Sequence, residues 1–166
     1  MISRRLLRIK VLQLVYARQK NTDISISNGE KELFFSIQKA YDLYHSLLIL
    51  PVELALIAKK RSDIAKSKNF PTSEELNPNL KFVKNSLIRG IQENETINSY
   101  INSKKISWEE YPELVKKVYN TLSETEEFQN YMSNESLSFK EDKEIVEFIF
   151  TEIVAQEELL SSITSY

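Results

Sequence analysis

The sequence predicts an all-α protein, a single helical domain over residues 1–166, built as a bundle of about six to eight helices around a buried N-terminal helix. Two glycines and four prolines among 166 residues provide little material for the tight turns of β-hairpins. Apolar residues recur at helical spacing along most of the chain, and several of these stretches follow a Ser-x-x-Glu pattern typical of a helix N-terminus. These observations favour helices joined by short connections.

The first predicted helix covers residues 4–17, and Ser3 is a suitable N-cap for it. No glycine, proline or acid interrupts it. At about 100° per residue, its apolar side chains cover one side and much of the other. They are Leu6, Leu7, Ile9, Val11, Leu14, Val15 and Tyr16. Because a helix that is apolar around most of its circumference needs neighbours on several sides, we expect it at the centre of the bundle.

The remaining helices follow from periodicity and from helix-breaking residues. A long helix is expected over residues 30–66, with a kink or break at Pro51, because proline removes a backbone donor. A loop with one turn follows over residues 68–79. Further helices are expected at about 80–91, 97–101, 108–122, 124–132 and 139–163.

The composition argues against catalysis. The absence of cysteine excludes disulfides, cysteine-based zinc sites and thiol chemistry, and it fits a cytoplasmic protein. The single histidine, His45, lies in an apolar stretch without the partners that a metal site or a catalytic triad needs, so we expect a structural role for it. No glycine-rich phosphate loop occurs. We therefore expect no enzyme activity, no metal and no organic cofactor.

Charge is distributed unevenly along the chain. Residues 1–106 hold 18 Lys and Arg against 10 Asp and Glu, whereas residues 107–166 hold 4 against 14. Such a division suits a basic surface for nucleic acid and an acidic surface for a basic protein. Alternatively, the two halves neutralise each other within the bundle.

A membrane role is not expected. The most apolar stretch, residues 43–58, contains His45, Pro51 and Glu53, and nothing reaches the roughly 20 apolar residues that span a bilayer. The start of the chain does not have the pattern of a secretory signal. An arginine-rich amphipathic start can also mark a targeting or membrane-surface helix, which is a further alternative.

The cations of the first helix indicate an anionic partner. Cations at a helix N-terminus oppose the helix dipole by roughly 0.3–1 kcal/mol each, so stability alone does not explain them. Guanidinium groups bind phosphate through a bidentate fork, and a nearby tyrosine can stack on a base or hydrogen-bond a phosphate. Arg4, Arg5, Arg8 and Tyr16 are therefore candidate RNA-binding residues. A solvated helix end, or pairing with this chain's own acids, is the alternative.

The same residues carry a family resemblance. The pattern Arg-Arg-x-x-Arg-x-x-x-Leu-Gln-x-x-Tyr-Ala, from Arg4 to Ala17, resembles the opening helix of the NusB family of transcription antitermination factors. A weaker likeness to a later family helix covers residues 139–160. What lies between the two stretches, including residues 32–44, looks like the long N-terminal half of Bacteroidetes-type members. The resemblance thus concerns the N-terminal region of such proteins, and the usual C-terminal half is expected to have no counterpart here.

The resemblance implies an RNA-binding transcription antitermination factor. Such a factor binds single-stranded boxA-type RNA together with the small-subunit ribosomal protein NusE, within the antitermination complex of RNA polymerase. Carried over to this chain, Arg4, Arg5 and Arg8 contact phosphate, and Tyr16 contacts a base or sugar. The competing hypothesis is a helical protein-interaction module without RNA binding, whose arginines pair with acids in residues 107–166.

Overall fold

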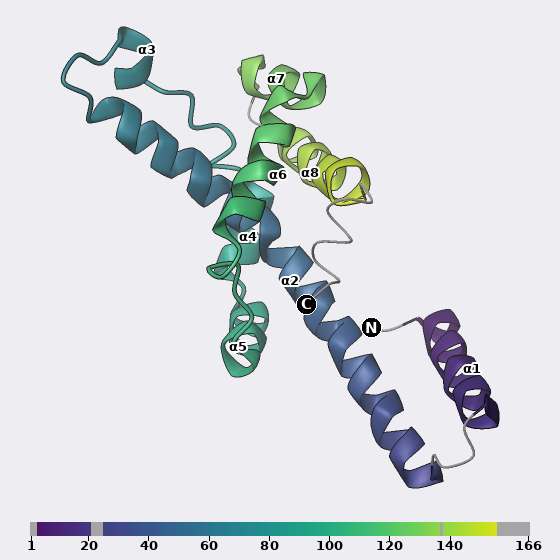
Figure 1. Ribbon diagram of the computed structural model, residues 1–166. Helices are drawn as coiled ribbons and strands as arrows, with labels where there is room; N and C mark the ends of the chain where they lie inside the picture. Colours follow the sequence, from purple (N-terminus) through teal and green to yellow (C-terminus); the bar gives the residue numbers. More distant parts are fainter. Residues whose placement is uncertain (1–2, 21–24, 137, 156–166) are drawn as a thin grey trace. The chain divides into compact units, whose positions relative to one another are not determined.

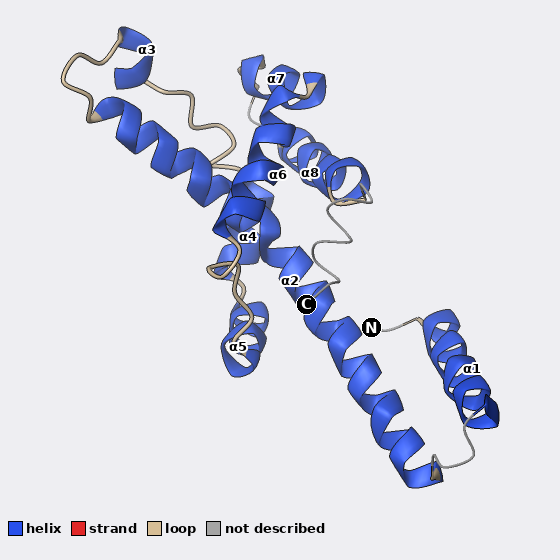
Figure 2. Cartoon of the chain, in the orientation of Figure 1, coloured by secondary structure: helices blue, strands red, loops and turns tan. Residues whose placement is uncertain are grey.

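The computed structural model describes residues 3–20, 25–136 and 138–155. Regular secondary structure in these residues is entirely helical, without a strand (Figures 1 and 2), which confirms the predicted all-α fold. The helices are α1 (Arg4–Lys20), α2 (Ile26–Lys66), α3 (Ser73–Leu76), α4 (Ser86–Glu93), α5 (Glu95–Lys104), α6 (Pro112–Glu124), α7 (Glu126–Ser133) and α8 (Phe139–Phe148), and the π-helical turn η1 (Ile149–Ile153) follows α8.

The chain divides into two compact units, Met1–Leu47 and Leu48–Tyr166. The first unit contains α1 and the first part of α2, and the second contains the rest of α2 and the later helices. We describe each unit by itself. The single domain expected over residues 1–166 stays a prediction.

In the first unit, α1 lies beside the beginning of α2 (Figure 1). Leu14 lies against the buried Gly29, where its Cδ1 is 3.4 Å from the position that a Cβ would occupy. The ammonium group of Lys10 donates a hydrogen bond to the Ser36 hydroxyl. At the start of α1, the Ser3 hydroxyl accepts a hydrogen bond from the Leu6 N–H at 3.2 Å, which confirms the predicted N-cap. Local capping and one contact stripe therefore hold α1 in place.

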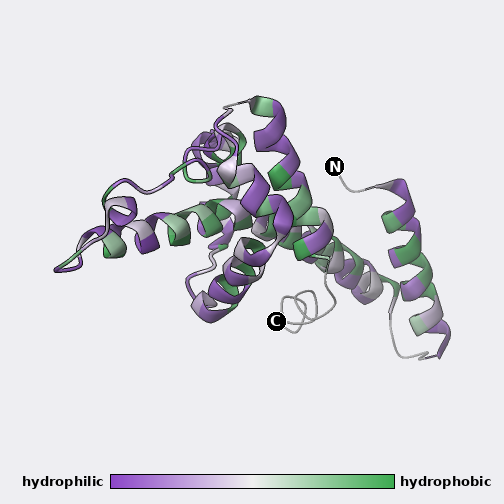
Figure 3. Ribbon diagram, turned by 90° about the horizontal axis from the view of Figure 1, so that it is seen from above, coloured by the Kyte–Doolittle hydropathy of each residue, from purple (hydrophilic) through white to green (hydrophobic). Residues whose placement is uncertain are grey.

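The expectation of a buried N-terminal helix is wrong. No residue of α1 is buried, and Leu12 is 69% exposed. Within its unit, only the first part of α2 is present to cover α1, and a single neighbouring helix buries one stripe rather than a whole circumference. Hydrophobic positions of α1 are consequently left on its surface (Figure 3).

The long helix α2 is not divided at its proline. It runs from Ile26 to Lys66 with Pro51 inside it, so the expected break does not occur. A proline in a helix removes one backbone hydrogen bond, and the Pro51 ring is fully buried. Leu50 and Leu54, before and after it in the helix, are fully buried as well.

The hydrophobic core lies in the second unit. Every buried apolar side chain among the described residues falls between Leu50 and Val154. In this core, α6, α8 and η1 contribute Leu122, Ile145 and Ile149, and Phe82 meets Phe128 edge-on with ring centroids 5.1 Å apart. The second unit is therefore the better-packed part of the chain.

The N-termini of the helices in this unit provide a test of the predicted capping patterns. Ser138 accepts a hydrogen bond from the Glu141 N–H at 3.2 Å and caps α8, as predicted. Ser107 and Ser123 are not caps, because α6 begins with Pro112 and the α7 cap is Thr125. The predicted helix at residues 80–91 begins only at α4, and the end of the predicted helix 139–163 lies outside the described residues.

Candidate nucleic-acid interface

The three predicted arginines all lie exposed at the N-terminal end of α1. Arg4 and Arg8 are one helical turn apart, and Arg5 lies about 100° round the helix from Arg4. Within the described residues of the first unit, none of the three guanidinium groups forms an ion pair. The described first unit thus provides no carboxylate partner for these three side chains.

Tyr16 lies on the same side of α1 as Arg5. The two are eleven residues apart, which places them within about 20° of each other around the helix and about 16 Å apart along its axis. The Tyr16 ring is 61% exposed, and the Lys20 ammonium group lies 5.7 Å from its centroid. The structure thus brings Arg5, Arg8 and Tyr16 to one face, with Arg4 at its flank.

The same face carries apolar side chains, although α1 as a whole was expected to be buried. Ile9, Leu12 and Val15 are all exposed between the cations and Tyr16. We define the α1 face as the surface formed by Arg4, Arg5, Arg8, Ile9, Leu12, Val15 and Tyr16. The α1 face is both cationic and apolar, a combination that periodicity alone did not predict.

His45 is packed among aromatic rings. It is buried, and its Nδ1 lies 2.9 Å from the Tyr41 carbonyl oxygen. Its ring meets Tyr41 and Tyr44 edge-on, with centroids 4.5 and 5.2 Å away. These contacts support the predicted structural role. In the part of the chain that the structure describes, no group of three or more His, Asp and Glu side chains could hold a metal ion.

The second unit contains a polar network that the sequence did not reveal. The Lys81 ammonium group donates to the Asn134 carbonyl at 2.8 Å and to Glu141 Oε2 at 3.0 Å, and it lies 4.4 Å from the Tyr131 ring centroid. Hydrogen bonds from the Ser136 hydroxyl and from Lys81 hold the pKa of Glu141 below its ordinary value. The network joins the segment before α4 to α7 and α8.

Asp142 belongs to the same network. Burial alone would raise its pKa, but hydrogen bonds from the Ser86 N–H and hydroxyl, at 2.8 and 2.6 Å, and from the Tyr131 hydroxyl outweigh that effect and keep the pKa low. The pKa of Tyr131 is raised, mainly by burial and secondly by the hydrogen bond that its hydroxyl donates to Asp142. These groups are well satisfied by one another, which indicates a structural rather than a catalytic role. Because Ser86 and Asp142 are 56 residues apart in sequence and Lys81 and Glu141 are 60 apart, no local motif could have indicated these contacts.

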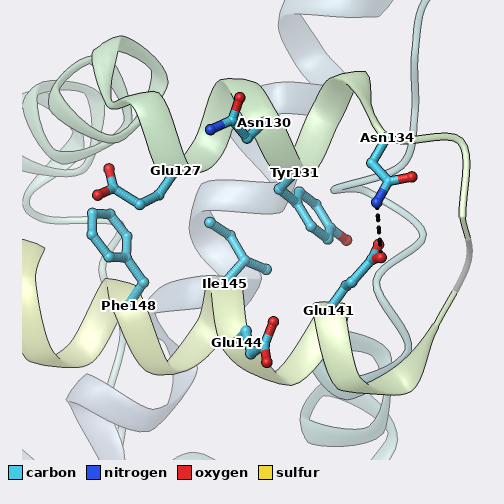
Figure 4. Close-up of a pocket in the computed structure, with 8 residues that line it drawn as sticks. All are labelled: Glu127, Asn130, Tyr131, Asn134, Glu141, Glu144, Ile145 and Phe148. Atoms are coloured by element: carbon cyan, nitrogen blue, oxygen red, sulfur yellow. Dashed lines mark hydrogen bonds between the residues drawn. The ribbon is translucent and has the colours of Figure 1, made fainter.

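A pocket of about 500 Å³ lies between α7 and α8 (Figure 4). Its walls carry the Glu127, Glu141 and Glu144 carboxylates beside the Phe148 and Tyr131 rings, and the Asn134 amide donates to Glu141 at 2.9 Å. An acidic pocket repels phosphate, so it is not a nucleic-acid site. The α1 face, by contrast, carries three exposed arginines.

One helix in the described part of the chain, α2, is long and apolar enough to cross a membrane by length and composition. This is weak evidence, because the core helix of a soluble protein passes the same test. The expected lack of a membrane partner stays a prediction.

No family model matches the chain, and neither curated proteins nor solved structures give a match. The likeness to the NusB family therefore rests on the residues that carry it, chiefly Arg4 to Ala17 of α1.

Proposed function

We propose that this chain binds single-stranded RNA on the α1 face, with Arg4, Arg5 and Arg8 on phosphates and Tyr16 against a base. The observation that carries the proposal is the exposure of three guanidinium groups without ion pairs in the described first unit, on the helix that also exposes Tyr16.

Physical chemistry favours an anionic polymer at this position. The cations oppose the dipole of α1, and a bound phosphate would relieve that repulsion while releasing counterions. Stacking of a base on an exposed aromatic ring contributes about 1–3 kcal/mol and tolerates different base sequences. The exposed Leu12 adds apolar surface for the faces of unstacked bases.

The resemblance of residues 4–17 to NusB-type helices suggests the particular ligands. On that basis we propose a cytoplasmic transcription antitermination factor that binds boxA-type RNA with the ribosomal protein NusE, within the antitermination complex of RNA polymerase. BoxA-type RNA, alone and with NusE, is therefore the first ligand to test.

A protein-interaction module without RNA binding is the second candidate. The exposure of Ile9, Leu12 and Val15 favours it, because these side chains form an apolar stripe along α1 that a partner helix could cover.

The test replaces Arg4, Arg5 and Arg8 together with glutamine and measures boxA-type RNA binding by fluorescence anisotropy over a range of salt concentrations. Affinity should fall, and the log–log salt slope should decrease by roughly 0.7 per lost phosphate contact, about two units in all. The melting temperature should barely change, because the arginines are exposed at a helix end that disfavours cations.

A matched control replaces three exposed lysines of the second unit, Lys59, Lys66 and Lys104, with glutamine. It removes the same charge and should leave the slope unchanged. An unchanged slope in the arginine variant would refute RNA binding at the α1 face. A similar loss of slope in both variants would instead indicate a response to net charge alone.

A further inference from the structure

A groove in the second unit lies where the C-terminal part of α2 meets α6 and the segment before it. The Arg61 guanidinium lies 4.8 Å from the Tyr119 ring centroid and donates to Asn120 Oδ1 at 2.5 Å, which fixes α2 against α6. The groove has a volume of about 420 Å³, within the range of about 300–1,000 Å³ that is usual for binding pockets. Its apolar lining consists of Leu56, Ile57, Ile64, Trp108, Pro112 and Val115.

The groove has a buried floor and an exposed apolar wall. Trp108 and Val115 are almost fully buried and form its floor. On α2, by contrast, Leu56 is 40% exposed and Ile64 is 65% exposed. These two side chains are eight residues apart on one helix, with Lys60 one turn from each, so the α2 wall has two separate apolar positions that the described residues leave open.

Along the α2 side of this groove, acidic side chains come first and basic side chains follow further along the helix. Glu53 is near Glu109 at one end, where burial and then the Glu109 charge raise the pKa of Glu53. Lys60 and Arg61 follow two turns later on α2, and Lys116 faces the groove from α6. The groove is thus acidic at its beginning along α2 and basic further on.

This pattern complements an α-helix. A helix carries partial positive charge at its N-terminus and partial negative charge at its C-terminus, so one lying along α2 in the same direction matches both ends of the groove. An extended peptide would place its backbone N–H and C=O groups against apolar side chains without hydrogen-bond partners. Glu53 and Glu109 would repel phosphate at the beginning of the groove, which disfavours RNA along its whole length.

We propose that the groove between α2 and α6 binds an amphipathic α-helix of a partner protein. The helix has its N-terminus beside Glu53 and Glu109, and it carries acidic side chains at its C-terminal end toward Lys60 and Lys116. From Glu53 to Ile64 the distance along α2 is about 16 Å, so three turns of the partner fill it. The surface shares no residue with the α1 face, so the proposal is independent of RNA binding.

Trp108 provides a direct readout, because it is the single tryptophan of the chain and lines the groove. The probe is a synthetic helical peptide of about three turns with leucines at i, i+3 and i+7 and glutamates in its last turn. Titration of the full chain should produce a saturable change in Trp108 fluorescence. A peptide with lysines in place of the glutamates should bind at least about tenfold more weakly, because it places cations against cations.

Two variants locate the site. Ile64→Glu should weaken binding of the acidic peptide by about tenfold or more, because it removes an apolar contact and places a carboxylate beside the glutamates of the peptide. Its melting temperature should stay close to that of the parent, because Ile64 is largely exposed. Leu76→Glu, an equally drastic change at an exposed leucine of α3 outside the groove, should leave binding unchanged.

The proposal is overturned if the acidic peptide gives no saturable signal, or if both peptides bind equally and Ile64→Glu has no effect. Sedimentation of the chain alone gives a further check. A dimer that Ile64→Glu dissociates would mean that a second copy occupies the groove, which would also overturn the assignment to a partner's helix.

Discussion

Asn85 should be among the polar residues on which the stability of the second unit depends most. Its side chain is fully buried at the start of α4. Its Oδ1 accepts hydrogen bonds from the Leu87 and Ile88 N–H groups, both at 3.0 Å, and so caps the helix. Its amide group donates to the Tyr131 hydroxyl at 3.2 Å and to the Asp142 carbonyl at 3.1 Å. One residue therefore joins α4 to α7 and α8.

The magnitude of an Asn85→Ala substitution follows from these four bonds. Loss of the N-cap costs about 1 kcal/mol. Loss of the amide removes two hydrogen bonds and leaves acceptors at Tyr131 and Asp142 without that donor, which costs about 1–3 kcal/mol. Because the Tyr131 hydroxyl still donates to Asp142 Oδ1 at 2.7 Å, the network is weakened rather than abolished. We expect a total loss of about 2–4 kcal/mol in the free energy of unfolding.

The assay is urea unfolding at pH 7, followed by far-UV circular dichroism and by the fluorescence of Trp108, which lies in the same unit. Asn85→Ser, which keeps a capping oxygen but lacks the amide donors, should lose less than Asn85→Ala. Asn102→Ala, at an exposed position of α5, is the matched control and should change stability by no more than about 0.5 kcal/mol. A loss below about 0.5 kcal/mol in Asn85→Ala would refute the reasoning, since it would mean that neither the cap nor the buried bonds contribute.

Two further predictions concern a core leucine and a half-buried acid. Because Leu122 is fully buried, Leu122→Ala should lower the free energy of unfolding in urea by about 2–5 kcal/mol. Leu12→Ala, on the exposed side of α1, should lower it by less than about 0.5 kcal/mol. Equal losses in the two variants would contradict the assignment of the core. Glu53 has a pKa raised above 4.5 by burial and by Glu109, against the opposing charge of Lys60, so the folded state binds its proton more tightly than the unfolded state does. The protonated Glu53 side chain therefore contributes to the stability of the fold at pH values below 4.5. That contribution is lost as the pH rises through the folded-state pKa of Glu53. Glu53→Gln should raise the melting temperature at pH 7 and have little effect at pH 3, and a variant less stable than the parent at pH 7 would contradict this.

The part of the candidate interface that depends on helical geometry could be predicted from the sequence. An uninterrupted helix after Ser3 places Arg5 and Tyr16 on one side whatever surrounds it, because the period of the helix fixes the angle between them. The Ser138 cap of α8 was predictable for a similar reason, since its hydrogen bond spans three residues. The surroundings of these side chains were not predictable in this way.

Exposure of α1 is the clearest example of a property decided by tertiary structure. Its sequence has enough apolar side chains to be surrounded, yet Leu12 and Val15 are exposed because the described first unit provides only the start of α2 to cover the helix. The periodicity of apolar residues indicates which sides of a helix could be buried. The neighbouring elements determine which of those sides are in fact buried.

The Asn85 network and the groove between α2 and α6 depend on the fold even more strongly. Asn85, Tyr131 and Asp142 become neighbours only when α4, α7 and α8 pack together, and Glu53 meets Glu109 only where α2 passes the segment before α6. The sequence by itself determined the helical character of the chain, the caps at Ser3 and Ser138 and the spacing of charges along the helices, because these depend on residues within about four positions of one another. Burial, pKa shifts and concave surfaces were decided by the tertiary structure, because each arises from atoms that are distant in sequence and close in space.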